Sequence, residues 1–508
     1  SVLRLCWIRY KLFRRQHAVL EGVPRDSSNM IVSGIGKVLT VIRHPLEPAV
    51  VMFEAFCGFS ELTSPDGIFQ FWIGLQPFVV LHTAETIEPL LSSNLNIDKT
   101  EEYHFMNAIL GEGLLTSSGA KWRKRRKMLT PAFHFRVLES CMTIFNDQAR
   151  VLLHKLHESS HLDYVDIFPM MTHCSLDILC ESAMGIKLQS QETSKYHYVQ
   201  NLHSILTVGM ERLNKPWLWW NVAYSLSHQN KNFKATALQI NQFVREVFIN
   251  IDPHNIKKKT LGTVGELPNG PNCAKAFLDL LIKHHIEDRS FTEKDINEEV
   301  NTFLFAGHET TAIGMTYVLY LLGLHPDIQE KVARELDSIF MGDTEREITR
   351  EDISAMKYLE CVIKECQRLY TIVPIYGRRI EEDMSIGNYQ VPRGCTCIIL
   401  SQMVHKDPRY FPNPSVFNPD RFLPENCKGR HPYAFIPFSA GPRNCVGQKF
   451  AMMEEKVLVS AVLRQFWITS LDHRDRLILV PLPLLHPRST QGGIRIRFTP
   501  RERRQPPA

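Results

Sequence analysis

Residues 435–459 read FIPFSAGPRNCVGQKFAMMEEKVLV, and this stretch says more about the fold than any other. A helix is predicted over 448–465, and Cys445 lies in the loop before it, between Gly441 and Gly447. The two glycines allow positive φ angles and a close approach of the backbone to a ligand. Amide groups at a helix start stabilise a thiolate. Cys445 is therefore a candidate nucleophile, redox thiol or metal ligand, with a buried structural thiol as the alternative.

The residues around Cys445 help to decide between these roles of the thiol. Arg443 adds a positive charge or an anion-binding donor, and Phe438 can cover the sulfur and exclude water. The pattern F-x-x-G-x-R-x-C-x-G, filled by Phe438, Gly441, Arg443, Cys445 and Gly447, resembles the haem-binding loop of the cytochrome P450 superfamily. The resemblance implies that Cys445 is the axial ligand of the haem iron and that the other four residues help to bind haem. Thiolate ligation favours O–O cleavage.

A second informative segment is the apolar run FLFAGHETTAIGMTYVLYLLGL at 303–324. Its length would suit a membrane span, but an acid at mid-membrane costs roughly 2.5–3.5 kcal/mol. Glu309 therefore favours a helix buried in a soluble core. This helix is predicted to start at Thr292, with Asp295 completing a capping box, and to end near Leu324.

Three residues within this helix are unfavourable for stability alone. Gly307 lowers helix propensity, Glu309 is ionisable in an apolar run, and Thr310 can bond a carbonyl one turn back. Together they predict a local opening, with a satisfied core acid beside a helix defect as the alternative. The pattern A-G-x-[DE]-T-T, from Ala306 to Thr311, resembles the oxygen-activation segment of the superfamily. That resemblance implies that Glu309 and Thr310 are catalytic and manage protons.

A helix predicted over 353–370 carries Glu365 and Arg368 on one face. An ordinary surface pair of this kind contributes about 0–1 kcal/mol. The superfamily instead has a buried E-x-x-R pair that is completed by an arginine, here Arg421 in the segment FNPDRF. The resemblance implies a structural role for these three residues.

Haem carries two propionates, and two further patterns match the superfamily's residues for them. Trp122 and Arg126 form W-x-x-x-R at helical spacing, and Pro374 and Arg378 form P-x-x-x-R. Arginine suits the paired recognition of carboxylates. The alternative for the first pattern is a solvated basic face. Part of that face is predicted to dock an acidic electron donor, through Lys121, Lys124 and Lys127.

The whole chain of 508 residues is 44% hydrophobic and 22% charged, with a formal net charge of +5. These values are typical of a globular protein, and the mild charge does not favour nucleic-acid binding. The pattern is mainly helical, with a hairpin at 69–75 and 78–81 and a loop at 255–274. The order of the motifs implies one large helical domain of P450 fold with small β-sheets, in place of several domains.

The first residues, SVLRLCWIRYKLFRRQ, combine apolar and basic side chains. They are too short to span a bilayer, which needs ~20 apolar residues. We predict that 1–25 is the remnant of a membrane anchor with a basic linker, and that 26–508 is the haem domain. The enzyme is then expected at the endoplasmic reticulum membrane, with its catalytic domain on the cytoplasmic side. A short amphipathic surface helix is the alternative.

Three other patterns do not indicate a functional site. His154, His157 and His161 are predicted to lie on a solvated helix face, because no convincing carboxylate or cysteine partner accompanies them. The segment GIGK at 34–37 lacks the remaining residues of a phosphate loop. The twelve cysteines show no zinc or dense disulfide spacing, so most are predicted to be buried free thiols in a reducing compartment.

At finer grain, residues 111–135 and 299–312 resemble family 4, which includes fatty-acid ω-hydroxylases. Many members carry a glutamate that forms an ester to haem, but this chain has Ala306 at that place. We therefore expect non-covalent haem b. An apolar substrate, such as a fatty acid or related lipid, is expected, with insect-type hormones, pheromones or xenobiotics as competing substrates.

The leading hypothesis is a haem-thiolate monooxygenase that inserts one oxygen atom of O2 into an apolar substrate. Electrons are expected from NADPH through a separate NADPH-cytochrome P450 reductase, with cytochrome b5 as a further donor. One alternative is a P450-fold isomerase or dehydratase acting on peroxides, and another is a non-catalytic haem sensor or carrier. Both leave Glu309 and Thr310 without a role.

Overall fold

The structure is a computed structural model that describes residues 2–25, 47–63, 65–73, 75–193, 197–214, 218, 221–246, 276–288, 290–490 and 492–501. The predicted loop at 255–274 and the GIGK segment at 34–37 lie outside these residues. Among these residues the fold is mainly α-helical with four small sheets, as expected for the P450 fold.

The α-helices within the described residues are α1 (Val2–Val19), α3 (Pro48–Leu62), α4 (Ala84–Ser92), α5 (Asn107–Leu110), α6 (Gly119–Leu129), α7 (Phe135–Ser140), α8 (Met142–Ser159), α9 (Ile167–Met184), α10 (Tyr198–Asn214), α11 (Asn221–Leu226), α12 (His228–Val244), α14 (Ala276–Glu287), α15 (Glu293–Leu324), α16 (Pro326–Phe340), α17 (Arg350–Ala355), α18 (Lys357–Leu369), α19 (Ser401–Val404) and α20 (Gln448–Gln465). The 3₁₀ turns used below are η6 (Pro419–Phe422) and η9 (Arg474–Arg476).

The strands of the described part of the chain form four sheets. A four-stranded sheet has the order β1 (Ile68–Ile73), β2 (Gln76–Leu81), β7 (Thr396–Ile399) and β4 (Tyr376–Arg379). The others are β5 (Met384–Ile386) with β6 (Tyr389–Val391), β9 (Leu477–Leu482) with β10 (Leu484–Ser489), and β3 (Val165–Asp166) with β11 (Arg495–Pro500) and β8 (Phe466–Ser470). The predicted hairpin is confirmed as β1 and β2, which pair antiparallel.

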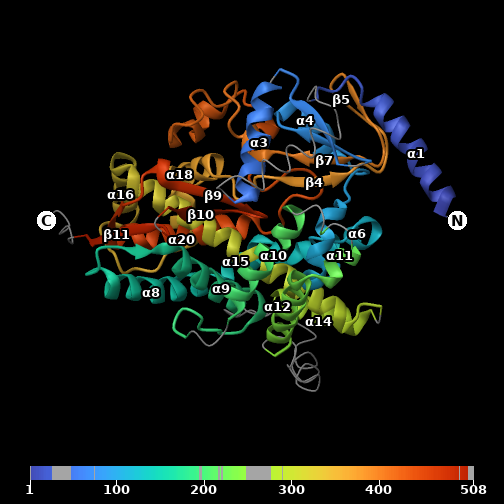
Figure 1. Cartoon of the computed structure of the whole chain (residues 1–508). Helices are drawn as coiled ribbons and strands as arrows, with labels where there is room; N and C mark the ends of the chain where they lie inside the picture. The colour runs from blue at the N-terminus through green and yellow to red at the C-terminus, as the bar shows by residue number, and fades with distance from the viewer. Residues whose placement is uncertain are drawn as a thin grey trace.

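Helix α15 runs through the middle of the molecule, and α9 and α20 pack against it (Figure 1). Its start is the predicted capping box, in which Asp295 accepts from the Thr292 N–H at 2.7 Å and Thr292 accepts from the Asp295 N–H. Between 298 and 322 the helix is buried except at Ala306, Gly307 and Thr310. The prediction of a buried core helix is therefore confirmed.

The predicted helix over 353–370 is divided in two. Met356 separates α17 from α18 with a ψ angle of 73°, outside the helical range. Each part has its own start, because Thr349 and Asp352 form a capping box for α17 while the Glu335 carboxylate accepts from the first N–H groups of α18. The prediction joined them because the hydrophobic pattern continues across the break.

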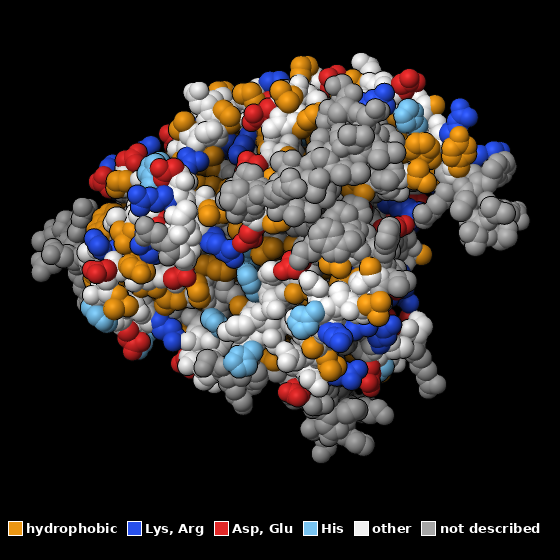
Figure 2. All heavy atoms as spheres, viewed as in Figure 1, with side chains coloured by type: hydrophobic (Ala, Val, Ile, Leu, Met, Phe, Trp, Pro, Cys, Tyr) orange, Lys and Arg blue, Asp and Glu red, His pale blue; other side chains and the backbone are white. Residues whose placement is uncertain are grey.

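The end of α1 packs on the four-stranded sheet. The Gln16 side chain donates to the Arg393 carbonyl at 2.9 Å, and Leu20 and Val23 are buried beside the sheet. Within the part of the chain that the structure describes, no helix has the length and apolarity needed to cross a bilayer. The face seen in Figure 2 carries interspersed acidic and basic side chains, in agreement with the mild net charge.

The histidine and cysteine predictions can be compared with the structure directly. His154 lies on the exposed face of α8, His157 bonds Gln465, and exposed His161 lies beyond the end of that helix. The described residues contain no cluster of potential metal ligands. Nine described cysteines are free thiols and six of these are buried, whereas Cys141 is disulfide-bonded.

Glu365 and Arg368 form a fully buried ion pair on α18. Arg368 Nε and Nη2 donate to the two carboxylate oxygens at 2.7 and 2.8 Å, and both side chains have no exposed surface. Arg421 of η6 approaches the same carboxylate at 3.4 Å. The alternative of an ordinary surface pair is therefore wrong. Removing one partner of a buried pair leaves an uncompensated charge in the core.

We expect Arg368→Ala to destabilise the protein by about 3–5 kcal/mol, because the Glu365 charge would remain buried without its partner. The matched control is Arg334→Ala, which removes an arginine of the exposed pair Glu330–Arg334 on α16. That change should cost at most about 0.5 kcal/mol. The measurement is the urea concentration at the unfolding midpoint, and equal midpoints for the two variants would contradict the prediction.

Candidate functional site

The loop before α20 presents the Cys445 thiol. The Cys445 N–H donates to the Phe438 carbonyl at 2.9 Å, which closes the loop. Gly441 has a φ of 69°, and a Cβ atom there would lie 1.8 Å from the Leu91 carbonyl oxygen. Glycine is thus required at this position for both backbone angle and space. At Gly447 an added Cβ would meet nothing closer than the Cys445 sulfur at 3.9 Å.

The thiol faces an internal space. Cys445 has exposed surface although the atoms around it lie deep in the protein, so the exposed surface belongs to an interior opening. Burial raises the pKa of the thiol, while the Gly447 and Gln448 N–H groups and Arg126 act to lower it. The helix-start amides therefore point to the sulfur as predicted, but burial outweighs them. A metal ion that coordinates a thiol deprotonates it outright.

Arg126 is held against the cysteine loop. Its Nη1 and Nη2 donate to the carbonyl and side-chain oxygens of Asn444, each at 2.7 Å. Trp122, one turn earlier on α6, is buried, and its ring lies under the Arg443 guanidinium at 4.7 Å. The predicted pair on α6 is thus brought to the Cys445 loop.

Three cations lie together beside this loop. Arg443 donates to the Ile97 and Ser117 carbonyls, and buried Arg378 on β4 donates to the neighbouring Gly377 carbonyl. The third is Lys99, whose Nζ lies 4.3 Å from the Tyr103 ring centre. Burial lowers the pKa of Arg378 and Lys99 and that of Arg443 to about 9, with repulsion among the three adding to the effect at Lys99 and Arg443.

This cluster fits an anionic ligand. None of the three cations forms an ion pair with a carboxylate among the residues that the structure describes. Buried charges are normally paired, so the cluster has an excess of positive charge. The two propionates of haem would supply the missing negative charge, and the Cys445 thiol beside an internal space would supply the iron ligand. The residues present therefore fit haem.

Helix α15 borders an internal space with three small residues. Ala306, Gly307 and Thr310 are partly exposed although the helix around them is buried, so this side of the helix also faces internal space. Thr310 Oγ1 donates to the Ala306 carbonyl at 2.8 Å, as predicted. The element remains α-helical throughout. A Cβ at Gly307 would lie 2.8 Å from Leu179 on α9, so the glycine also permits close helix packing.

Glu309 is a buried acid on a different side of α15 from Thr310. Its Oε1 lies 3.7 Å from His486 Nε2, while its Oε2 has no hydrogen-bond partner among the described residues. Burial raises the pKa of the Glu309 carboxyl to about 7. The alternative of a satisfied core acid is therefore not what the structure contains.

Sequence reasoning missed Lys99, Asn444 and His486. Lys99 lies in a stretch without any recognised pattern, and only the fold brings it to Arg378 and Arg443. Asn444 could have been suspected from its position beside Cys445. His486 follows an apolar run on β10 and is brought to Glu309 only by tertiary packing.

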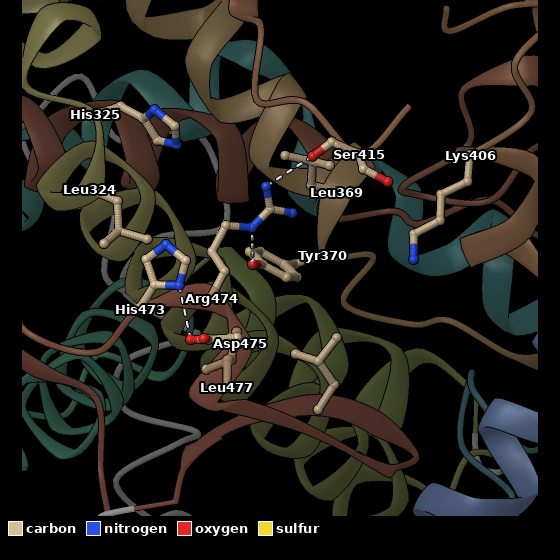
Figure 3. Close-up of a pocket in the computed structure, with 11 residues that line it drawn as sticks. Leu324, His325, Leu369, Tyr370, Lys406, Ser415, His473, Arg474, Asp475 and Leu477 are labelled. Atoms are coloured by element: carbon tan, nitrogen blue, oxygen red, sulfur yellow. Dashed lines mark hydrogen bonds and ion pairs between the residues drawn. The ribbon is translucent and has the colours of Figure 1, made fainter. Parts of the chain in front are cut away.

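A separate pocket of about 620 Å³ lies at the C-terminal end of α15 (Figure 3). Arg474 reaches the Tyr370 hydroxyl at 3.2 Å and the Ser415 carbonyl at 2.8 Å. None of the residues predicted for the site lines this pocket. The pocket is therefore distinct from the site at Cys445.

Comparison with known proteins agrees with this geometry. The family model described as Cytochrome P450 matches residues 51–490. Cytochrome P450 4V2 of Mus musculus is 42% identical over 442 residues, covering 86% of this chain and 83% of that protein. Cytochrome P450 4c3 of Drosophila melanogaster is 42% identical over 443 residues, covering 86% and 82%. The crystal structure of the cytochrome P450DA heme domain has a TM-score of 0.74 at 23% identity, covering 89% of this chain and 93% of that chain.

The chain is thus a monooxygenase with haem as its cofactor, and it belongs to the cytochrome P450 family. Within that family its relatives are of family 4, as the sequence segments predicted. The crystal structure, at low identity, supports the fold alone.

The raised pKa of Glu309 predicts a pH-dependent difference from Glu309→Gln. The folded protein holds the carboxyl proton more tightly than the unfolded chain, whose ordinary value is 4.5. Its contribution to stability is therefore fully present below pH 4.5 and is lost as the pH rises through 7. We expect the wild type to lose about 3 kcal/mol relative to the variant over this interval.

The measurement is urea unfolding of both proteins at several pH values. Other buried acids, such as Glu299 and Glu455, also have a raised pKa and make the wild-type curve depend on pH. They are present in both proteins and cancel in the comparison. Parallel curves for the two proteins would show that Glu309 is not the group responsible.

Proposed function

We propose that Cys445 is the axial ligand of haem iron and that Arg126, Arg378, Arg443 and Trp122 bind the propionate side of the haem. The observation that carries this proposal is the group of buried and partly buried cations, without carboxylate partners among the described residues, beside a thiol that faces internal space. When bound, haem activates O2 and transfers one oxygen atom to a C–H bond of the substrate.

Several neighbours support this arrangement. Lys99 is added to the propionate-binding residues because it lies with Arg378 and Arg443. Gly441 keeps the loop close to Leu91, and Gly447 leaves space beside the sulfur. Phe438 is half-buried, and we propose that its ring limits the access of water to the thiolate.

Glu309 and Thr310 are proposed to take part in proton transfer, each from a different side of α15. Thr310 carries its hydroxyl on the side that opens to internal space. Glu309 holds a proton that can be exchanged near neutral pH, because burial raises the pKa of its carboxyl to about 7. A general acid works best when its pKa lies near the working pH, so this carboxyl is suited to proton delivery.

The substrate is proposed to be an apolar lipid, with a fatty acid or related compound first. The support is the family 4 resemblance together with the small and apolar residues around Ala306 on α15. Ala306 cannot form an ester, so haem b is proposed to bind non-covalently.

Electrons are proposed to come from NADPH-cytochrome P450 reductase, with cytochrome b5 as a further donor. Two of the three lysines suggested for docking already form ion pairs. Lys121 pairs with Glu112 and Glu298, and Lys124 pairs with Asp288. Exposed Lys127 is therefore the strongest remaining candidate for contact with an acidic donor.

The cellular setting is proposed to be the endoplasmic reticulum membrane, with residues 1–25 as the remnant of an anchor and 26–508 as the haem domain. The basic residues near the start of the chain support a cytoplasmic orientation. The contacts of Gln16 and Leu20 with the sheet would hold this segment close to the catalytic domain.

The deciding experiment reconstitutes the purified protein with reductase, NADPH and O2, and analyses a panel of fatty acids by mass spectrometry. We expect NADPH-dependent hydroxylated products and, for the reduced protein with CO, the Soret band of thiolate ligation. Cys445→Ala should lose both, because no other cysteine of the described residues lies in the loop before α20. NADPH oxidation without any oxygenated lipid would contradict the fatty-acid proposal but not thiolate ligation.

Non-covalent haem has its own test. Acid denaturation followed by mass spectrometry should yield the bare polypeptide and free haem, because Ala306 offers no carboxylate for an ester. Ala306→Glu is the matched variant that restores a carboxylate at this place. A wild-type polypeptide whose mass includes haem would contradict the prediction.

A further inference from the structure

Three buried polar atoms meet between α15 and β10 without hydrogen-bond partners among the described residues. They are Glu309 Oε2 and both ring nitrogens of His486. The two side chains are 4% and 6% exposed, and His486 Nε2 lies 3.7 Å from Glu309 Oε1. Leaving a buried polar group unpaired is destabilising. An unpaired group in a native protein therefore calls for an explanation.

The separation of Glu309 and His486 is slightly longer than a hydrogen bond. Bonds between catalytic groups are often long in a protein without substrate and shorten in the working complex. A contact beyond 3.5 Å can also be bridged by one water molecule. Either change would give His486 Nε2 a partner at Glu309 Oε1.

The environment of His486 leads from this pair to the surface. The rings of His203 on α10 and His486 are nearly perpendicular, with 5.7 Å between ring centres. His203 is half-buried, and Arg488, two residues along β10, is exposed and pairs with Glu47 at 2.6 Å. Figure 1 shows β10 beside α15. Exposure thus increases stepwise from the core to solvent.

We propose that His486 is a positioning residue that supplies the proton of Glu309, and that His203 connects His486 to solvent. This inference rests on the proposed function, in which Glu309 delivers protons. It adds a route by which the buried acid regains its proton from the α10 side of the molecule.

The proton step is balanced. The Nε2–H bond of His486 breaks as an O–H bond forms on the Glu309 carboxylate, and Nδ1 takes a proton from the side of His203. The imidazole ring is neutral before and after the step. One proton has then moved from solvent to the carboxyl group.

The charges around His486 favour this exchange. The titratable or charged groups that face it are Glu309 from α15, His203 from α10 and Arg488 on its own strand, while Phe168 from α9 contributes an apolar ring. Burial, with smaller effects of His203 and Arg488, lowers the pKa of His486 to about 3. The ring therefore passes protons as a neutral group and does not store charge.

The test uses the haem-loaded protein with two variants, His486→Phe and His486→Gln. The first readout is the infrared C=O band of protonated Glu309, assigned from the difference between wild type and Glu309→Gln and titrated with pH. The second is the coupling of NADPH oxidation to product, measured in H2O and D2O. His173→Gln is the matched control, because His173 is a half-buried histidine of α9 that also has an unpartnered ring nitrogen.

We expect His486→Phe to raise the midpoint of the Glu309 band by about one pH unit, because the proposed hydrogen bond from His486 Nε2–H to the carboxylate can no longer form. Coupling should fall about tenfold, a modest share of what general acid catalysis contributes. His486→Gln keeps a donor and should restore the midpoint, but it should not restore coupling because an amide does not relay protons. His173→Gln should match the wild type in both readouts.

Two results would overturn the proposal. One is a wild-type midpoint and coupling in His486→Phe, and the other is full coupling in His486→Gln, which would leave a hydrogen-bonding role only. If His486→Phe does not fold, His486→Gln alone decides through its coupling. A separate measurement tests the proposed function itself. If the CO complex of the wild-type protein lacked the thiolate Soret band, the proposed function would fail whatever the His486 variants show.

Discussion

The buried pair of Glu365 and Arg368 is the constraint on which the site depends. Arg368 Nη1 donates to the carbonyl of His405 at 3.0 Å. His405 in turn bonds the Thr371 hydroxyl through Nδ1 at 2.7 Å, and its Nε2 accepts from the Ile436 N–H at 2.8 Å. Ile436 is the second residue of the stretch that ends at α20. The ion pair therefore fixes the start of the cysteine loop.

This chain of contacts explains why a charged pair is kept in the core. A buried pair is weak evidence of stability, since apolar residues of the same volume often serve as well. Apolar residues in place of the pair could not donate to the His405 carbonyl, and His405, which accepts from the Ile436 N–H, would lose this contact. From Ile436 the backbone reaches Phe438, whose carbonyl holds Cys445. The position of the thiol is thus set by a series of polar contacts that connects α18, through His405 and Ile436, to the loop before α20.

Residues that lie close together in the sequence predicted the starts and ends of helices. Contacts between distant segments could not be predicted from them. The capping box of Thr292 and the bounds of α20 follow from residues close together in sequence, so they were predicted correctly. The break at Met356 was missed, because the apolar pattern continues across it. Gly307 was interpreted as part of a local opening, whereas α15 remains α-helical there and the close approach of Gly307 to Leu179 depends on how α9 packs.

The same distinction applies to the site. Cys445, Arg126 and Arg378 were found because they fall into patterns typical of the superfamily. Lys99 and His486 were not, because neither belongs to such a pattern and each gains its neighbours only in the folded protein. Patterns can therefore name the residues of a reaction shared by many proteins. Such patterns cannot identify the neighbouring residues that modify this reaction in one particular protein.

Two kinds of charged or ionisable group lie in the interior around the site without a partner of opposite charge among the described residues. Their separation explains how each can keep its own role. On the side of the cysteine loop, Arg378 and Lys99 are cations whose pKa burial lowers. On α15, Glu309 is an acid whose pKa burial raises to about 7. If the two groups were in contact they would neutralise each other, and the acid would have a low pKa and no proton to deliver. Holding them apart leaves the cations for an anionic cofactor and keeps the carboxyl able to exchange a proton near neutral pH.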